Sequence, residues 1–436
     1  MGSSLGIQSA MRLGSMTDIY YYNSKTMSKQ SIPTIVDNRF YQALTSLGAG
    51  SSTFIISVDQ GISDIILSAK LPAQNASAGI DYTGLALPRG WLYHALSRIS
   101  VRYGSSSQFF FGSSQTLIAN LREMPNPQTR DQIFELGGAL MTTLGQFAGD
   151  NLTAYAYLNL PHNSPNGSLS KPNPLPSELL SQPIVITVEM NPLQSIFSTN
   201  DVAGSVAEAP KSFESAYFQV RQVHAKDSGD LMTIGAGGKG SAYSLPLKAF
   251  YQNEVSIQVG GNGTLDLTKP VKHDLQLTGF RNGEVRSIFF WITKDSDTRP
   301  STNVRNVKNF TNYILPKDVE LLYNGSVFYR ALNGSSQMWA LVTTETPPLL
   351  QATVLSFDGA NNIISTSKSS NWTEIPFSQH FEQLSGTSMY IAGKLIQNAV
   401  VNLSVTLPDN DRYTITLCYS YNSALMFSNG GAEYVF

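Results

Sequence analysis

The chain has 436 residues, of which 42% are apolar and only 14% are charged, and its formal net charge is −2. This length suggests two or three domains, and the apolar share allows sizeable cores and excludes wholesale disorder. With near-neutral charge and no long run of one sign, neither a nucleic-acid-binding face nor a role on anionic membranes is indicated. The single cysteine, Cys418, excludes an internal disulfide and any multi-cysteine metal site, and favours folding in a reducing compartment.

Residues 1–38 are polar and contain a tyrosine triplet, Tyr20 to Tyr22, without a sustained hydrophobic period. We predict that they form an arm, ordered by a neighbouring subunit or by an inner-face partner. The opening residues lack the apolar core of a signal peptide. No stretch approaches the ~18 uninterrupted apolar residues that a membrane helix needs.

From residue 39 onward, short runs rich in β-branched and aromatic residues alternate with Gly, Asn, Pro and Ser. The strands predicted for the first half are 52–58, 62–68, 91–103, 108–111, 184–190 and 216–224. Residues 129–147 predict a helix, because apolar residues recur there at spacings of three and four, although Gly137-Gly138 weakens the pattern. Residues 160–183, dense in Pro, Asn and Ser, predict a long loop.

Residues 227–241 form the most linker-like stretch and lie close to the midpoint of the chain. The strands predicted after it are 255–259, 273–280, 285–293, 319–322, 337–344, 399–407 and 412–419. Two halves of roughly 200 residues, each mainly short strands with long loops, indicate two β-sandwiches in tandem.

The residues that could carry chemistry do not form a recognisable site. The glycine cluster at 235–241 lacks the ending of a phosphate-binding loop, because Gly240 follows Lys239 where Ser or Thr is required, so a flexible linker is favoured. Cys418 lies in an apolar strand, where a packed thiol is expected. No metal-ligand pattern includes any of the five histidines: His94, His162, His224, His273 and His380. We therefore predict no catalytic, cofactor-binding or metal-binding residues, and a structural role.

A two-domain β-sandwich protein that binds carbohydrate or cleaves glycosides is the alternative from another class. Glycoside hydrolysis uses two carboxyl groups about 5 to 10 Å apart. Glu374, Glu382 and Asp409 are conceivable members of such a pair, but the sequence gives no way to place two of them at that separation. This alternative predicts a concave aromatic site with paired acids and a monomer in solution.

Several segments, taken in order, resemble the double jelly-roll major capsid proteins of icosahedral double-stranded DNA viruses, the lineage of nucleocytoplasmic large DNA viruses, virophages and Polinton-like elements. Residues 96–112 resemble an early ridge strand, with Gly104 and serines where the family usually has Gly-Gly. Residues 175–190, with Glu189, match a proline-leucine stretch leading into a strand. The other segments that carry the resemblance are 216–230, 275–297, 319–342 and the ending at 402–436.

The resemblance implies an all-β fold of two tandem eight-stranded jelly rolls with long loops and a few short helices. The domains expected are an arm at 1–38, a first jelly roll at 39–228 and a second at 229–436. It also implies a homotrimeric, pseudo-hexagonal capsomer that tiles an icosahedral shell, without enzymatic activity or cofactor. The partners implied are other copies of the chain, minor capsid or cement proteins and a possible membrane beneath the shell, and the location is the virion, after synthesis in the host cytoplasm.

The chain ends on an apolar strip that is broken by Asn429-Gly430-Gly431. We predict that residues 412–419 form the last strand, that residues 422–427 lie over its barrel or against a neighbour, and that the glycines redirect the chain. Tyr434, Val435 and Phe436 are then expected to be anchors. Deletion of the last seven residues is expected to lower the stability of the trimer more than the solubility of the monomer.

Overall fold

The computed structural model describes residues 35–57, 62–104, 109–112, 117–118, 121, 127–158, 180, 182–200, 209–225, 243–257, 270–276, 283–298, 305–323, 325–343, 349–376, 390–391, 399–428 and 431–435. Most of the predicted arm and of the 160–183 loop, and the 227–241 linker, lie outside these residues, as do Glu382, His162 and His380.

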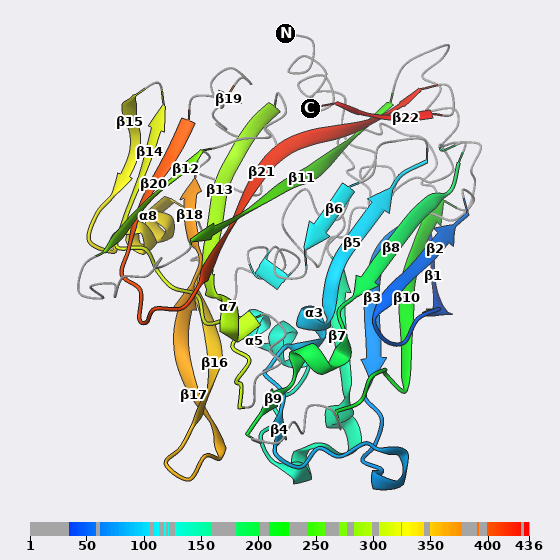
Figure 1. Cartoon of the computed structure of the whole chain (residues 1–436). Helices are drawn as coiled ribbons and strands as arrows, with labels where there is room; N and C mark the ends of the chain where they lie inside the picture. The colour runs from blue at the N-terminus through cyan, green and yellow to red at the C-terminus, as the bar shows by residue number, and fades with distance from the viewer. Residues whose placement is uncertain are drawn as a thin grey trace.

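The first half of the chain forms an eight-stranded sandwich, here called the first barrel (Figure 1). One sheet has the strand order β1-β10-β3-β7 and the other β2-β8-β5-β6. The strands are β1 (Ile35–Ala43), β2 (Gly50–Ile56), β3 (Ile62–Lys70), β5 (Leu96–Arg102), β6 (Phe109–Gly112), β7 (Thr153–Leu158), β8 (Ile184–Met190) and β10 (Ser215–Ala225). Alternate side chains fill the space between the sheets, where Phe54 meets Phe218 with ring centroids 3.8 Å apart.

The second half forms another eight-stranded sandwich, the second barrel, with sheets in the order β11-β21-β13-β18 and β12-β20-β14-β15. Its strands are β11 (Tyr243–Ile257), β12 (Val271–Gln276), β13 (Gly283–Lys294), β14 (Asp318–Tyr323), β15 (Ser326–Ala331), β18 (Thr373–Pro376), β20 (Ala399–Val405) and β21 (Tyr413–Ser428). Two short strands are added to its larger sheet: β19 (Tyr390–Ile391) pairs with β13, and β22 (Gly431–Val435) pairs with β21.

The two barrels have the same strand order. If the eight main strands of each barrel are counted along the chain, one sheet reads 1-8-3-6 and the other 2-7-4-5 in both halves. This antiparallel arrangement, in which the first strand pairs with the last, is the jelly roll. The predicted fold class, two tandem eight-stranded jelly rolls with a few short helices, is therefore confirmed.

Short helices and small sheets lie in the connections. The first barrel has η1 (Ala76–Ala78), β4 (Leu85–Ala86) and α3 (Trp91–Ala95) before β5; α5 (Pro127–Leu136), η2 (Leu144–Gln146) and η3 (Gly149–Leu152) before β7; and η5 (Leu193–Ile196) and β9 (Ser198–Thr199) before β10. In the second barrel, α7 (Asp295–Thr298) follows β13, and α8 (Ser336–Thr343), β16 (Leu349–Phe357) and β17 (Ile363–Asn371) precede β18. The β16–β17 hairpin projects from one end of the molecule, at the lower left of Figure 1.

The predicted helix at 129–147 is wrong in its second half, because α5 ends at Leu136. The chain crosses α3 at the next two residues: Leu92 N–H donates to the Gly137 carbonyl (2.9 Å), and Gly90 N–H donates to that of Gly138 (2.8 Å). Gly138 has a φ of 132°, and a Cβ there would collide with the indole of Trp91. The glycine pair ends the helix because two backbones meet at this point.

Two predicted strand segments are helical. Of residues 337–344, expected as a strand, those that the structure describes, 337–343, belong to α8, which follows a left-handed turn at Asn333 (φ 54°) and Gly334 (φ 77°). Residues 91–95, expected as the start of a strand, form α3, and only β5 after them is extended. A short apolar run does not distinguish a strand from a buried helix, so the periodicity was ambiguous at both places.

The last strand is longer than expected. β21 pairs with β11 along 15 residues, from Tyr243 opposite Phe427 to Ile257 opposite Tyr413. Residues 422–427, expected to leave the strand, instead continue it. β22 then folds back on β21, with Gly431 opposite Ser428, so the end of the chain forms a hairpin.

Candidate functional site

The two described acids considered for glycoside cleavage, Glu374 and Asp409, are each bound by other side chains. Glu374, on β18, is 2% exposed, and Trp372 Nε1 donates a hydrogen bond to its Oε2 over 3.4 Å. Asp409 belongs to the loop before β21 and binds Lys294 and Tyr413. Glu382 lies outside the described residues. Each described carboxylate is thus engaged by its own neighbours.

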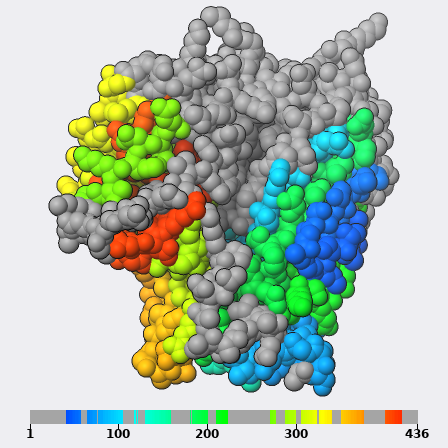
Figure 2. Space-filling model, in the orientation of Figure 1, coloured from blue at the N-terminus to red at the C-terminus, as the bar shows by residue number. Residues whose placement is uncertain are grey.

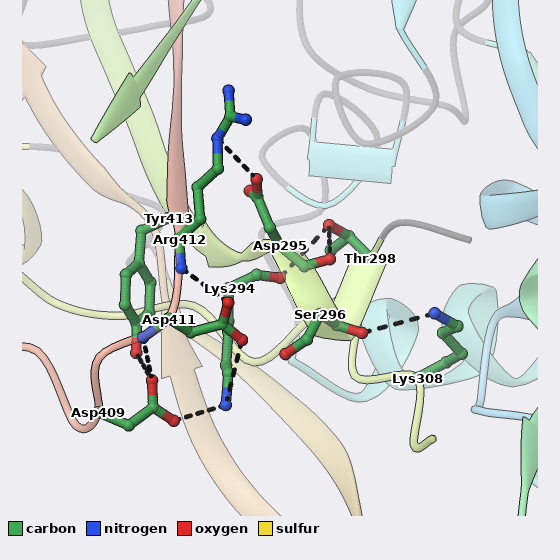
Figure 3. Close-up of polar contacts among 9 residues, drawn as sticks. All are labelled: Lys294, Asp295, Ser296, Thr298, Lys308, Asp409, Asp411, Arg412 and Tyr413. Carbon is green, nitrogen blue, oxygen red and sulfur yellow. Dashed lines mark hydrogen bonds and ion pairs between the residues drawn. The ribbon is translucent and has the colours of Figure 1, made fainter. Parts of the chain in front are cut away.

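Asp409 lies in a polar cluster that joins the end of β13 to the start of β21 (Figure 3). Lys294 Nζ donates to Asp409 Oδ2 (2.5 Å) and lies 3.5 Å from Asp411 Oδ2, while the Tyr413 hydroxyl donates to Asp409 Oδ1 (2.6 Å). Burial alone would raise the pKa of Asp409, but the hydrogen bonds from Lys294 and Tyr413 hold that pKa below its ordinary value. An ionised, bound carboxylate of this kind holds strands together and is poorly suited to donate a proton.

The same cluster continues into α7. Arg412 Nε lies 3.2 Å from Asp295 Oδ2, and the Thr414 hydroxyl donates to Asp295 Oδ1 (2.7 Å). Asp297, two residues further along α7, is also buried. Burial raises the pKa of Asp297 to about 6, and the charges of Lys294 and Lys308 oppose that rise.

The first and second barrels meet in a buried seam, and their apolar residues form one continuous core. The Lys308 N–H donates to Ser198 Oγ (2.8 Å), and Thr199 and Asn306 exchange backbone hydrogen bonds of 2.8 and 3.0 Å. These bonds join β9 of the first barrel to the segment before β14 of the second. The seam is therefore both hydrogen-bonded and apolar.

Two further contacts across the seam involve ionisable side chains. His94, on α3, stacks on Phe310 of the second barrel with ring centroids 4.3 Å apart, and burial lowers the pKa of His94 to about 3. Arg130, on α5, is 4% exposed, and its charge interacts with that of the buried Glu374 on β18. Burial lowers the pKa of Arg130 to about 10, and Glu374 opposes that shift, so the side chain stays charged near neutral pH. Both residues serve the junction of the barrels.

The β16–β17 hairpin is fixed to the seam by Asn309. The Asn309 side chain accepts a hydrogen bond from Leu355 N–H (2.7 Å) and donates one to the Leu355 carbonyl (3.0 Å). Leu355 and Ile363 of the hairpin pack with Ala86 of the first barrel. Because a two-stranded hairpin is marginally stable alone, these contacts hold the projection in place.

A groove of about 330 Å³ lies on the outer face of the β1-β10-β3-β7 sheet. Tyr41 and Tyr157 contribute aromatic rings, and Asp64 is the carboxylate of its lining. Asp64 accepts a hydrogen bond from the Tyr157 hydroxyl (2.9 Å) and pairs with Arg221 (3.4 Å). With one acid in the described lining, the groove does not contain the pair that glycoside hydrolysis requires.

Exposed large apolar side chains lie at both outer ends of the molecule and also elsewhere in the described structure, at Leu136, Leu144, Tyr155, Tyr217 and Ile364. At one end, Tyr41 on β1 and Ile55 on β2 are 67% and 64% exposed. The other end includes β15, α8 and the turn between them, whose exposed apolar residues are Val327, Phe328, Leu332, Met338 and Trp339. These ends are the blue strands at the right and the yellow region at the left of Figures 1 and 2.

Among the described residues, no group of three or more His, Cys, Asp or Glu side chains is arranged to hold a metal ion. No helix among them has the length and apolar character needed to cross a membrane. Cys418 is buried in β21, in agreement with the packed thiol predicted from the sequence. Sequence reasoning missed the seam residues His94 and Arg130, because nothing local to either residue indicates a partner in the other half of the chain.

The fold defines a class of structures, the tandem double jelly rolls. No protein-family model matches the chain, and neither does any curated protein. Among solved structures, the capsid of the virus PBCV-1 is similar, with a TM-score of 0.63, 9% identity, and coverage of 95% of this chain and 100% of that one. The Faustovirus major capsid protein is similar with a TM-score of 0.54, 8% identity and 98% of both chains covered. The Sputnik virophage structure gives a TM-score of 0.51 at 12% identity, covering 95% of this chain and 91% of that one. The predicted resemblance is thus confirmed at the level of the fold.

Proposed function

We propose that the chain is a viral major capsid protein, a structural subunit without enzymatic activity. The observation that carries this proposal is the full-length double jelly roll, which is shared with a PBCV-1 capsid chain over 95% of this chain and 100% of that one. The described carboxylates are consistent with it, because Glu374, Asp64 and Asp409 each bind neighbouring side chains. The buried seam is consistent too, since it joins two barrels into one building block.

The functional unit in this proposal is a homotrimer of pseudo-hexagonal outline. Three copies of a chain with two similar barrels place six barrels around one axis, and such tiles pave flat facets of an icosahedral shell. The shell contacts involve other copies of the chain and minor capsid or cement proteins, with a membrane beneath the shell as a further possible neighbour. The protein then resides in the virion, after synthesis in the host cytoplasm. Residues 1–38 are the proposed arm, of which residues 35–38 lie in β1, and residues 39–228 and 229–436 are the proposed domains.

Sizing with light scattering tests the trimer directly. The chain has a mass of 47.5 kDa, so the expected assembly has a mass of about 140 kDa. Negative-stain images of that fraction should show a pseudo-hexagonal outline. A stable monomer at micromolar concentration would contradict the proposal, because subunit contacts of permanent assemblies are large and persist on dilution.

The second candidate is a carbohydrate-binding protein, which the groove beside Tyr41 and Tyr157 favours. Aromatic faces are suited to pack against sugar rings, and the groove lies on an accessible sheet face. Binding of a glycan panel to the wild-type chain, compared with a Tyr157→Ala variant, separates the two functions. Saturable binding that Tyr157→Ala abolishes, together with a monomeric wild type, would support this candidate over the capsid protein.

A further inference from the structure

The β1-β10-β3-β7 sheet, at the right of Figure 1, has a groove on its outer face that follows one row of residues. In this row, Tyr41 of β1 lies opposite Gln219 of β10. Gln219 lies opposite Ile66 of β3, which in turn lies opposite Tyr157 of β7. All four residues line the groove, so it crosses the sheet with a tyrosine at each end. Since neighbouring strands are about 4.8 Å apart, the row is about 14 Å long.

One side of this row carries a polar pair. Asp64 and Arg221 also line the groove, and they lie opposite each other on β3 and β10. Arg221 Nη1 lies 3.4 Å from Asp64 Oδ2, and the Tyr157 hydroxyl donates to Asp64 Oδ1 (2.9 Å). Together with the amide of Gln219, the described lining therefore offers a carboxylate, a guanidinium and an amide, whose formal charges cancel.

The next row along the same face adds two more tyrosines. Ser68 lies opposite Tyr217 on one side and opposite Tyr155 on the other, and these tyrosines are 43% and 41% exposed. The solvent side of an antiparallel sheet normally carries polar residues. A tyrosine instead presents an apolar ring together with a polar tip. This face of the sheet therefore offers ring surfaces beside hydrogen-bonding groups.

Sugars are the class of ligand that this combination fits best. A sugar ring has a face of C–H groups that packs against an aromatic ring, and its rim carries hydroxyls. Each hydroxyl is both a donor and an acceptor, so it can bind a carboxylate and a guanidinium or an amide at the same time. A nucleic-acid strand would instead require a basic lining, whereas the charges of Asp64 and Arg221 balance each other. The length of the row favours several linked rings over a single sugar.

We propose that the groove binds a neutral oligosaccharide of a few rings on a cell surface, so that the capsid chain also attaches its shell to glycan-bearing surfaces. This inference rests on the proposed function, because a shell presents many copies of the groove, and many weak contacts made together hold a particle firmly. The ligand is neutral because an acidic sugar would bring a second carboxylate close to Asp64, and like charges repel. Glycan binding is then an activity of the assembled trimer.

A panel of oligosaccharides tests the class of ligand. The wild-type trimer is labelled and applied to immobilised neutral oligosaccharides, each paired with its sialylated derivative. At least one neutral member is expected to bind saturably, and about tenfold more tightly than its sialylated derivative, because of the repulsion at Asp64. Titration calorimetry then measures the dissociation constant of the same oligosaccharide free in solution. Equal or tighter binding of the sialylated derivatives would overturn the assignment of a neutral ligand.

Tyr41 provides the sharpest variants, because its side chain is 67% exposed and its replacement is expected to leave the fold intact. Tyr41→Ala removes a ring at one end of the groove, and we expect it to raise the dissociation constant for the oligosaccharide by about tenfold. Tyr41→Phe retains the ring, so we expect a change of less than about twofold. Circular dichroism checks that each variant is folded.

Tyr155→Ala is the matched control. Tyr155 is an exposed tyrosine of the same sheet face, and it is outside the described lining of the groove. Its replacement is expected to leave the dissociation constant within about twofold of the wild type, because no ring of the groove is lost. Equal weakening by Tyr155→Ala and Tyr41→Ala would overturn the assignment of the groove.

Display of the sugar on a surface separates attachment from the binding of a free sugar. A trimer carries three grooves, so beads coated with the oligosaccharide are expected to hold it about 100-fold more tightly than one groove binds the free oligosaccharide. An excess of the free oligosaccharide should release the trimers from the beads. An equal apparent affinity for the displayed and the free oligosaccharide would overturn the attachment function.

The outcomes also separate this inference from the proposed function. A wild-type trimer that binds no member of the panel overturns the glycan site and leaves the capsid proposal standing. A monomeric wild type overturns the capsid proposal and, with it, the attachment of a shell. Trimers that bind a neutral oligosaccharide, lose that binding with Tyr41→Ala and retain it with Tyr155→Ala support both.

Discussion

The two barrels share one strand order and differ in what they insert between strands five and six. In the first barrel, α5, η2 and η3 are inserted, and the segment that follows α5 is hydrogen-bonded to α3 through the backbone of Gly137 and Gly138. In the second, α8 packs against β18 and the long β16–β17 hairpin projects outward. The sheets thus fix the architecture, whereas the insertions decide which surfaces are buried in the seam and which remain exposed.

The largest expected effect comes from removing the buried cation Arg130 of the first-barrel insertion, whose charge interacts with that of Glu374 in the second barrel. Arg130→Met leaves the buried Glu374 without that cation, and we expect a loss of about 3 kcal/mol or more in the free energy of unfolding. Urea unfolding measured by tryptophan fluorescence checks this. The double variant Arg130→Met with Glu374→Gln should recover most of the loss, and no recovery would show that packing, rather than charge, dominates at Arg130.

The next largest effect is expected at Gly138 in the first barrel, where the backbone lies close to Trp91. Gly138→Ala places a Cβ against the Trp91 indole at a φ of 132°, and we expect a loss of about 2–3 kcal/mol. Gly145→Ala is the matched control, because a Cβ there has nothing within 4 Å. Thermal unfolding of the two variants should differ clearly. Similar melting temperatures would mean that the chain relaxes at Gly138 without cost.

The seam should respond to acid through His94 on the first-barrel side. Its pKa in the folded chain, about 3, lies below the ordinary value near 6.5. Between these two pH values the unfolded chain binds a proton on His94 that the folded chain does not bind. The contribution of His94 to the free energy of unfolding is fully present above pH 6.5. It decreases as the pH falls, by about 2 kcal/mol at pH 5. His94→Phe should remove that part of the slope in urea unfolding measured between pH 5 and 7.5. An unchanged slope would exclude His94 as its source.

The contribution of Asp297, on the second-barrel side, to stability should change with pH in the opposite direction. Its folded pKa of about 6 lies above the ordinary 3.8, so its contribution is complete below pH 3.8 and is lost as pH rises through 6. Asp297→Asn should therefore raise stability at pH 7, by on the order of 1–2 kcal/mol. The same unfolding series checks this, and a destabilised variant at pH 7 would mean that the contacts to Lys294 and Lys308 outweigh burial.

The smallest effect concerns the strand-end cluster of the second barrel. Lys294→Met removes the partner of Asp409 and Asp411, and we expect a loss of about 1 kcal/mol, because the group is only partly buried. The exposed pair of Lys70 with Glu214 in the first barrel is the control, and Lys70→Met should change stability by less than about 0.5 kcal/mol. Equal effects would remove the distinction between the two sites.

The sequence predicted the strands with alternating or β-branched patterns well, and β8 and β10 begin and end within a residue of their expected limits. It did not predict α3 or α8, because short apolar runs such as residues 337–344 suit either a helix or a strand. The ordered motifs predicted the double jelly roll. The seam could not be predicted, because the contact of His94 with Phe310 joins residues more than 200 positions apart and depends on how the barrels meet.

The continuous core between the barrels also has a kinetic consequence. Because the two barrels are covalently joined and packed, their mutual contact has no bimolecular step, and it forms at any dilution. In the proposed trimer, six barrels come together in two association steps, whereas six separate barrels would need five, and each avoided step saves the translational and rotational entropy of one association. With fewer association steps, the rate of assembly depends less steeply on the concentration of the chain. Assembly is therefore favoured early, when few copies of the chain have accumulated.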